Sequence, residues 1–224
     1  MKKWISLGDS ITDCGRLFYY SPYGDGYVSL VERRLNPKPL WDVQNRGIDG
    51  FTLARVYQQL CQSPISPRPE DCSFLAVSLL VGINDVAMMM TTDRTQAQIH
   101  RMQEQFSALY DQLLKRLELE GCDRILVMEP FVFSWPAGLK TWQPCLREIS
   151  RRIREAAGKN QKALFLPLWQ KLEQAAEAEG VDQITTDGVH LTRKGHELLA
   201  EEVYRELMAA ADDGSRNPFE AARR

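Results

Sequence analysis

Residues 73–81 form an almost continuous apolar run, SFLAVSLLV, and no other feature restricts the fold of this chain as strongly. A strand with one face in water usually alternates apolar and polar side chains, whereas this segment offers apolar side chains to both faces. We therefore expect a strand that is covered on both sides, as in a parallel sheet that lies between two layers of helices.

Strand-like and helix-like patterns alternate along the rest of the chain. Four shorter strands are predicted at 4–8, 41–44, 124–128 and 163–166. Helices are predicted at 26–35, 95–119, 146–157, 168–179 and 191–211, and one more follows the loop at 45–52 and ends at about residue 60. This alternation predicts an α/β fold, in which right-handed crossovers join parallel strands. We expect a single domain over residues 1–211 and a disordered tail over 212–224, because the tail lacks an apolar pattern.

The bulk composition narrows the class of partner. A formal net charge of −2 gives no basic field, which argues against a nucleic-acid partner. The five cysteines are scattered without a C-x-x-C pair, as expected for reduced thiols rather than a zinc site or a disulfide framework. No signal-peptide pattern and no run of about 18 apolar residues is present. We expect a cytoplasmic protein that does not bind membranes.

Polar residues follow three of the predicted strands. Ser10 comes directly after the first strand, Gly50 lies in the loop after the second, and Asn84 lies in a predicted polar loop after the apolar run. In a parallel sheet these positions collect at the carboxyl edge, where ligands bind in such folds. Each residue also has a simpler interpretation, since Ser10 is a good helix cap, Gly50 a good turn residue and Asn84 a good Asx-turn residue.

A serine nucleophile needs a base, and the chain has three histidines. His100 and His196 lie inside predicted helices. His190 lies in a predicted loop three residues after Asp187, a spacing that lets a tight turn bring the carboxylate to one ring nitrogen. Taken alone, Asp-x-x-His is equally compatible with a helix-capping turn.

Four short blocks, in this order, resemble those of the SGNH (GDSL) hydrolase superfamily: GDSITD at 8–13, NRGIDG at 45–50, GIND at 82–85 and DGVH at 187–190. The resemblance implies Ser10 as nucleophile, His190 as base and Asp187 as the residue that orients the base. It also implies an oxyanion hole formed by the Ser10 and Gly50 N–H groups and the Asn84 amide. It leaves Gly47 as a turn residue. For Asp9, Asp13 and Asp85 we favour a structural role in bracing loops over a chemical role.

The same resemblance implies a flavodoxin-like three-layer α/β/α sandwich with a five-stranded parallel sheet in the order 2-1-3-4-5, and no metal or cofactor. Residues 8–16, 24–27 and 128–131 further resemble a bacterial branch of intracellular acetylxylan esterases, although Leu191 stands where that branch commonly has proline. The expected activity is hydrolysis of short-chain acetyl esters on carbohydrates such as xylo-oligosaccharides, through an acyl-enzyme. Five loop aromatics are candidates to stack on sugar rings, or else to pack against the protein: Tyr19, Tyr20, Tyr23, Trp135 and Trp142.

Other functions remain open at this stage. A lipolytic esterase, lysophospholipase or acyl-thioesterase would use the same triad, with Met88, Met89 and Met90 lining an apolar groove rather than filling the core. A metallophosphoesterase would use the block carboxylates with His190, but three histidines are few for a two-metal site. A non-catalytic carbohydrate-binding protein is a further alternative. The expected partner is a small-molecule or oligosaccharide ester, and a homo-oligomer is compatible with the sequence.

Overall fold

The structure is a computed structural model, which describes residues 1–18, 21–37, 40–65 and 70–213. Its five parallel strands form one sheet in the order β2-β1-β3-β4-β5, which confirms the expected topology. The strands are β1 (Lys2–Gly8), β2 (Trp41–Asn45), β3 (Phe74–Leu80), β4 (Arg124–Met128) and β5 (Ala163–Leu166). Every residue of β3 is buried, as its apolar run predicts, and β3 lies at the centre of the sheet.

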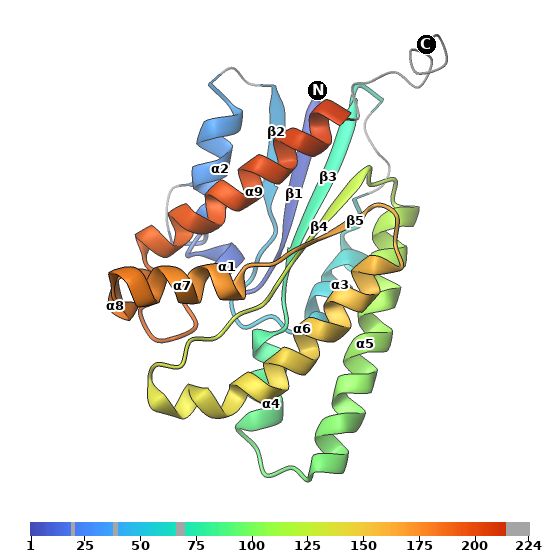
Figure 1. Ribbon diagram of the computed structural model, residues 1–224. Coiled ribbons are helices and arrows are strands. Elements are labelled where there is room, and N and C mark those ends of the chain that lie inside the picture. The colour runs from blue at the N-terminus through green and yellow to red at the C-terminus, as the bar shows by residue number, and fades with distance from the viewer. Residues whose placement is uncertain (19–20, 38–39, 66–69, 214–224) are drawn as a thin grey trace, which may run out of the picture.

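Helices cover both faces of the sheet. Right-handed crossovers place α3 (Leu53–Gln62), α5 (Gln96–Leu119) and α6 (Gln143–Gly158) on one face. On the other face, α2 (Tyr27–Leu35) packs against α9 (Arg193–Asp213), which crosses in front of the strands in Figure 1. α9 continues to Asp213, so the first two residues of the predicted tail are helical; residues 214–224 lie outside the described residues.

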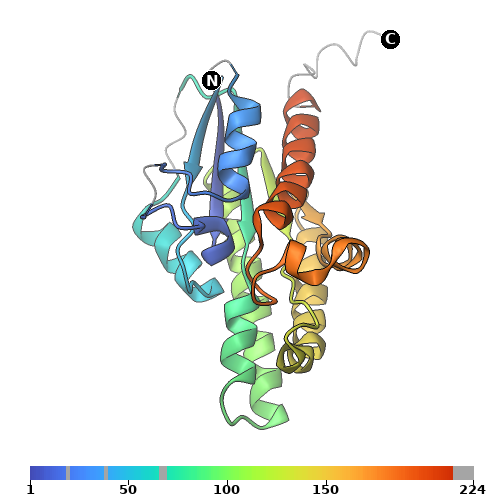
Figure 2. The same ribbon diagram turned by 90° about the vertical axis from the view of Figure 1, so that its left-hand side faces the viewer.

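The carboxyl edge of the sheet carries the segments that the sequence blocks predict. The short α1 (Ser10–Asp13) follows β1, and α4 (Ile83–Met90) follows β3. Beyond β5, α7 (Trp169–Glu179) and α8 (Val181–Ile184) lead to the loop that precedes α9. The N-terminus and the last turn of α9 lie together at the opposite end of the molecule (Figure 2).

The sequence interpretation differs from the structure at Asn84. This residue was expected in a loop, but it lies in the first turn of α4, which starts at Ile83. Ile83, Val86 and Met89 recur at helical spacing and are all buried, so the helix forms to bury this apolar face. Gly82, with φ +135°, makes the turn between β3 and α4, and the polar residues after it belong to a helix N-terminus.

Candidate active site

The turn between β1 and α1 fixes the position of Ser10. The Asp9 carboxylate accepts a hydrogen bond from the N–H of Ile11 (3.1 Å) and so caps α1. A Cβ at Gly8 would lie 2.3 Å from the Thr12 hydroxyl oxygen and 2.5 Å from the carbonyl oxygen of Leu80. Only glycine fits this close to Thr12 and to the backbone of β3, and the turn after it makes Ser10 the first residue of a helix at the edge of the sheet.

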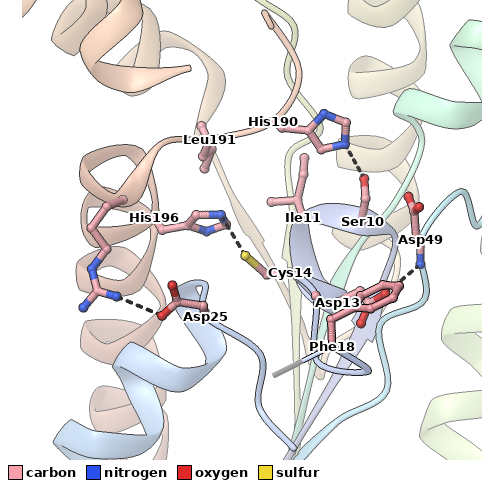
Figure 3. Close-up of a pocket in the computed structure, with 12 residues that line it drawn as sticks. Ser10, Ile11, Asp13, Cys14, Phe18, Asp25, Asp49, His190, Leu191 and His196 are labelled. Carbon is pink, nitrogen blue, oxygen red and sulfur yellow. Dashed lines mark hydrogen bonds and ion pairs between the residues drawn. The ribbon is translucent and has the colours of Figure 1, made fainter. Parts of the chain in front are cut away.

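Ser10, His190 and Asp187 form one continuous chain of contacts. The Ser10 Oγ lies 2.9 Å from His190 Nε2, and His190 Nδ1 lies 2.6 Å from Asp187 Oδ2 (Figure 3 shows the first contact). A carboxylate only accepts hydrogen bonds, so the ring proton belongs on Nδ1 and Nε2 is left to accept the serine proton. This is the arrangement in which a histidine activates a serine hydroxyl.

The loop between α8 and α9 holds Asp187 in place. Asp187 Oδ1 accepts hydrogen bonds from the N–H groups of Val189 (2.9 Å) and His190 (2.7 Å). Partial burial would raise the pKa of this carboxyl, but hydrogen bonds from the His190 ring and from these two N–H groups lower the pKa below its usual value. Asp187 therefore stays ionised beside the imidazole.

The structure leaves hydrogen-bond donors free near Ser10. Within the described part of the chain, the N–H groups of Ser10 and Gly50 donate to no acceptor. Asn84 Nδ2 donates one hydrogen to the carbonyl oxygen of Phe51 (3.0 Å), which leaves its second amide hydrogen available. By contrast, the N–H of Gly47 donates to Asn45 Oδ1 (2.9 Å). Gly47 is thus used inside the turn, and Gly50 is the glycine with a free donor.

Two carboxyls of the blocks lie in or near the core: Asp9 is buried and Asp85 is half-buried. Burial raises the pKa of each to about 7, and the charge of Asp85 adds to the rise at Asp9. Asp85 Oδ2 accepts the N–H of Leu53 (3.0 Å), which ties α4 to the start of α3. Asp13 accepts the N–H of Asp49 (3.2 Å). Asp85 and Asp13 therefore join neighbouring segments through their side chains, whereas the Asp9 side chain bonds within its own turn.

Asn45, at the end of β2, is a positioning residue that the sequence interpretation did not single out. It is buried, and its Nδ2 donates to the carbonyl oxygens of Thr12 (2.7 Å) and Tyr23 (2.9 Å). Its Oδ1 accepts the N–H of Gly47. Asn45 thus joins α1 to the loop that carries Gly50. The signal available in the sequence was its place as the first residue of the NRGIDG block.

A cavity of about 410 Å³ opens beside Ser10 and His190. Three further side chains that line it were not predicted as site residues: Asp25, Asp49 and Arg193. Cys14 and His196 also line it, and their Sγ and Nε2 atoms lie 3.4 Å apart (Figure 3). Sequence spacing gives no sign that the loop before α2 and the start of α9 meet at this cavity.

Of the predicted stacking aromatics, the three that the structure describes do not line this cavity. Tyr19 and Tyr20 lie outside the described residues. Tyr23 and Trp142 are half-buried and pack against the hydrophobic core, and Trp135 lines a separate surface cavity beside Phe133. Met89 is buried in the core, and none of the three methionines of α4 lines the cavity at Ser10.

The described residues contain neither a candidate membrane span nor a candidate metal site. No helix there is both long enough and apolar enough to cross a bilayer. In the same ranges, no three His, Cys, Asp or Glu side chains are grouped so that they could hold a metal ion, so the block carboxylates and His190 do not form such a group.

Comparisons with known proteins agree with the fold and the blocks. A model of the GDSL-like lipase/acylhydrolase family matches residues 6–198. An acetylxylan esterase from Geobacillus stearothermophilus is 27% identical over 221 residues, with 92% of this chain and 94% of the esterase covered. A crystal structure of a catalytic mutant of such an esterase from that organism has a TM-score of 0.74 at 23% identity, over 92% of this chain and 94% of that one. An alpha/beta hydrolase from the metagenome of Lake Arreo, Spain, has a TM-score of 0.73 at 21% identity, over 93% and 94% of the two chains.

Proposed function

Because this chain belongs to the GDSL-like lipase/acylhydrolase family and is a serine carboxylic ester hydrolase, we propose that it removes short acyl groups, above all acetyl, from carbohydrates such as xylo-oligosaccharides. The observation that carries the proposal is the contact chain from Ser10 through His190 to Asp187 at the mouth of the cavity. The acetylxylan esterase relative supports the choice of substrate.

The proposed reaction has two steps. His190 Nε2 takes the proton of Ser10 as the hydroxyl attacks the acyl carbon, and Asp187 stabilises the imidazolium. The oxyanion accepts hydrogen bonds from Ser10, Gly50 and Asn84, which are fixed before the reaction. The alcohol leaves with the proton from His190, and an acyl-serine remains. Water then attacks the acyl-serine in the same way, which releases the acid and restores Ser10.

The cavity lining favours a short acyl group and a neutral alcohol. A long acyl chain needs an extended apolar groove, but among the described residues that line the cavity the large apolar side chains are only Ile11, Phe18 and Leu191. Charged side chains make up much of the rest, with three aspartates and one arginine. An excess of carboxylates repels the phosphates of lysophospholipids and of carrier-bound thioesters. We also propose a cytoplasmic location, in line with the five free cysteines.

The test is a chain-length series of p-nitrophenyl esters from acetyl to decanoyl, followed by acetylated xylo-oligosaccharides. We expect kcat/KM to be highest for acetyl and the xylo-oligosaccharides to release acetate. The Ser10→Ala variant should lose at least about 10³-fold in kcat. Ser63→Ala, a change at an exposed serine outside the cavity, is the control and should match the wild type. Maximal activity on long chains would support a lipolytic esterase instead, and unchanged activity of Ser10→Ala would refute the nucleophile.

A further inference from the structure

The cavity at Ser10 extends away from the reacting atoms to a pair of charged side chains. Asp25, in the loop before α2, lies at the far end of the cavity from Ser10 in Figure 3, with Cys14 and His196 between them. The Asp25 carboxylate accepts a hydrogen bond from the guanidinium of Arg193, the first residue of α9, at 3.3 Å. The proposed acyl group is short and is held at Ser10, so it does not extend to this far end. The far end therefore faces the alcohol part of the ester.

The pair has hydrogen-bonding capacity to spare. Arg193 has five N–H donors, of which one contacts Asp25 and another contacts Glu197 at 3.2 Å. In the described ranges, the second carboxylate oxygen of Asp25 has no hydrogen-bond donor. Both side chains are about half exposed, so a ligand can reach them. A donor and an acceptor side by side suit a hydroxyl group, which accepts and donates at once.

His196, in the middle of the cavity, is a neutral side chain. His196 Nδ1 accepts the N–H of Tyr27 (3.2 Å), so its proton is on Nε2, which faces the Cys14 sulfur. Burial lowers the pKa of His196 to about 4, and the ring is therefore neutral at physiological pH. An anionic alcohol would meet Asp25 and Asp49, and Arg193 is the one arginine among the described lining residues to compensate them. The cavity thus suits a neutral, polar alcohol.

We propose that Asp25 and Arg193 bind free hydroxyl groups of the alcohol that carries the acyl group, and so select polyhydroxylated esters. This inference rests on the proposed esterase function. The two residues are specificity residues, since they lie at the far end of the cavity from Ser10 and take no part in the acyl transfer.

The experiment compares Arg193→Ala and Asp25→Ala with the wild type on three substrates. The first is a methyl xyloside with one acetyl group and two free hydroxyls, the second is the same compound with both hydroxyls methylated, and the third is p-nitrophenyl acetate. Arg193→Lys tests whether charge without the planar guanidinium suffices. Arg205→Ala is the control, because Arg205 lies on the same helix, is similarly exposed and also forms ion pairs.

We expect both alanine variants to raise KM for the free-hydroxyl substrate about 10-fold, with kcat unchanged, and Arg193→Lys to fall between them and the wild type. Activity on the methylated substrate and on p-nitrophenyl acetate should stay within twofold. An exposed ion pair contributes little to folding, so the variants should keep the wild-type Tm. Equal losses on all three substrates, or no loss on any, would overturn the inference. A wild type that prefers the methylated compound would overturn it as well, whereas a wild type inactive on p-nitrophenyl acetate would refute the esterase function itself.

Discussion

Asp187 binds His190 at two points, since Oδ2 lies 2.6 Å from the ring Nδ1 and Oδ1 accepts the backbone N–H at 2.7 Å. One carboxylate therefore sets both the loop and the position of the ring proton. An amide in its place keeps one acceptor oxygen but presents N–H groups to Nδ1, so the ring proton moves to Nε2. His190 then has no lone pair for the serine proton.

For Asp187→Asn we expect kcat for p-nitrophenyl acetate to fall by about 10³- to 10⁴-fold, with little change in Tm. Steady-state kinetics and thermal unfolding measure the two effects. Asp182→Asn, an exposed change in α8, is the control and should leave kcat unaltered. A loss of less than tenfold in Asp187→Asn would mean that His190 does not depend on this carboxylate.

Gly50 combines a free N–H with a left-handed backbone, φ +71°, and open space around it, since no atom lies within 4 Å of a Cβ built there. Gly121 shares the left-handed backbone (φ +85°) and the open space, but its N–H donates to the carbonyl oxygen of Glu118 (3.1 Å), and it lies just after α5, outside the cavity at Ser10. We expect Gly50→Ala and Gly121→Ala each to lower the free energy of unfolding by about 1 kcal/mol, because alanine is strained at positive φ. In Gly50→Ala alone, the loop relaxes, the donor turns away and kcat falls about tenfold or more. Equal kcat in both variants would exclude the Gly50 N–H from the oxyanion hole.

Asn84 lies at the helix N-terminus with one amide hydrogen bound to Phe51 and one free. Asn84→Ala removes the free donor, and we expect kcat to fall by about 10²- to 10³-fold while KM changes little. Kinetics on p-nitrophenyl acetate separate the two constants. A rise in KM with normal kcat would instead assign Asn84 to binding of the ground state.

Much of this architecture could be predicted because its determinants are local. The run at 73–81 predicts a doubly covered strand, and the alternation of strands and helices then brings Ser10, Gly50 and Asn84 to one edge. The family resemblance names the same residues in the same order. The prediction of a loop at Asn84 was wrong because it relied on the polar residues next to Asn84. The apolar face of α4 consists of Ile83, Val86 and Met89, which recur at helical spacing.

The rest of the site depends on contacts that no spacing encodes. Asp25 and Arg193 are 168 positions apart and meet only because α2 packs on α9. Cys14 and His196 are brought together in the same way, and the interpretation of His196 as a residue within a helix gave no indication of the cavity it lines. Short segments such as α8 also escape prediction, because four residues carry too little periodicity to show a helix.

Asp85 and His196 make the folding stability depend on pH in opposite directions. Burial raises the pKa of Asp85 from 3.8 to about 7, so between about pH 4 and 7 the native state binds more protons than the unfolded state. The stability that Asp85 contributes when protonated is therefore lost as the pH rises through this range. Burial lowers the pKa of His196 from 6.5 to about 4, so its contribution is lost as pH falls through the same range. The wild-type profile contains both contributions and also that of Asp9, whose pKa is likewise raised to about 7, so a substitution is needed to isolate the part due to Asp85.

Asp85→Asn keeps an oxygen that can accept the N–H of Leu53 but removes the buried charge. At pH 8 we expect the free energy of unfolding of the variant to exceed that of the wild type by roughly 1 to 4 kcal/mol, because each unit of pKa shift corresponds to about 1.4 kcal/mol. The variant also lacks the Asp85 charge that raises the pKa of Asp9. At pH 4 the difference should be close to zero, since Asp85 is then protonated in the native state. Urea unfolding at both pH values measures this, with Asp111→Asn on α5 as the control for a half-exposed carboxylate. If the difference in free energy of unfolding between Asp85→Asn and the wild type is the same at pH 4 and pH 8, the pKa of Asp85 is not raised in the native protein. Asp85 would then hold α4 as a charged side chain rather than a neutral one.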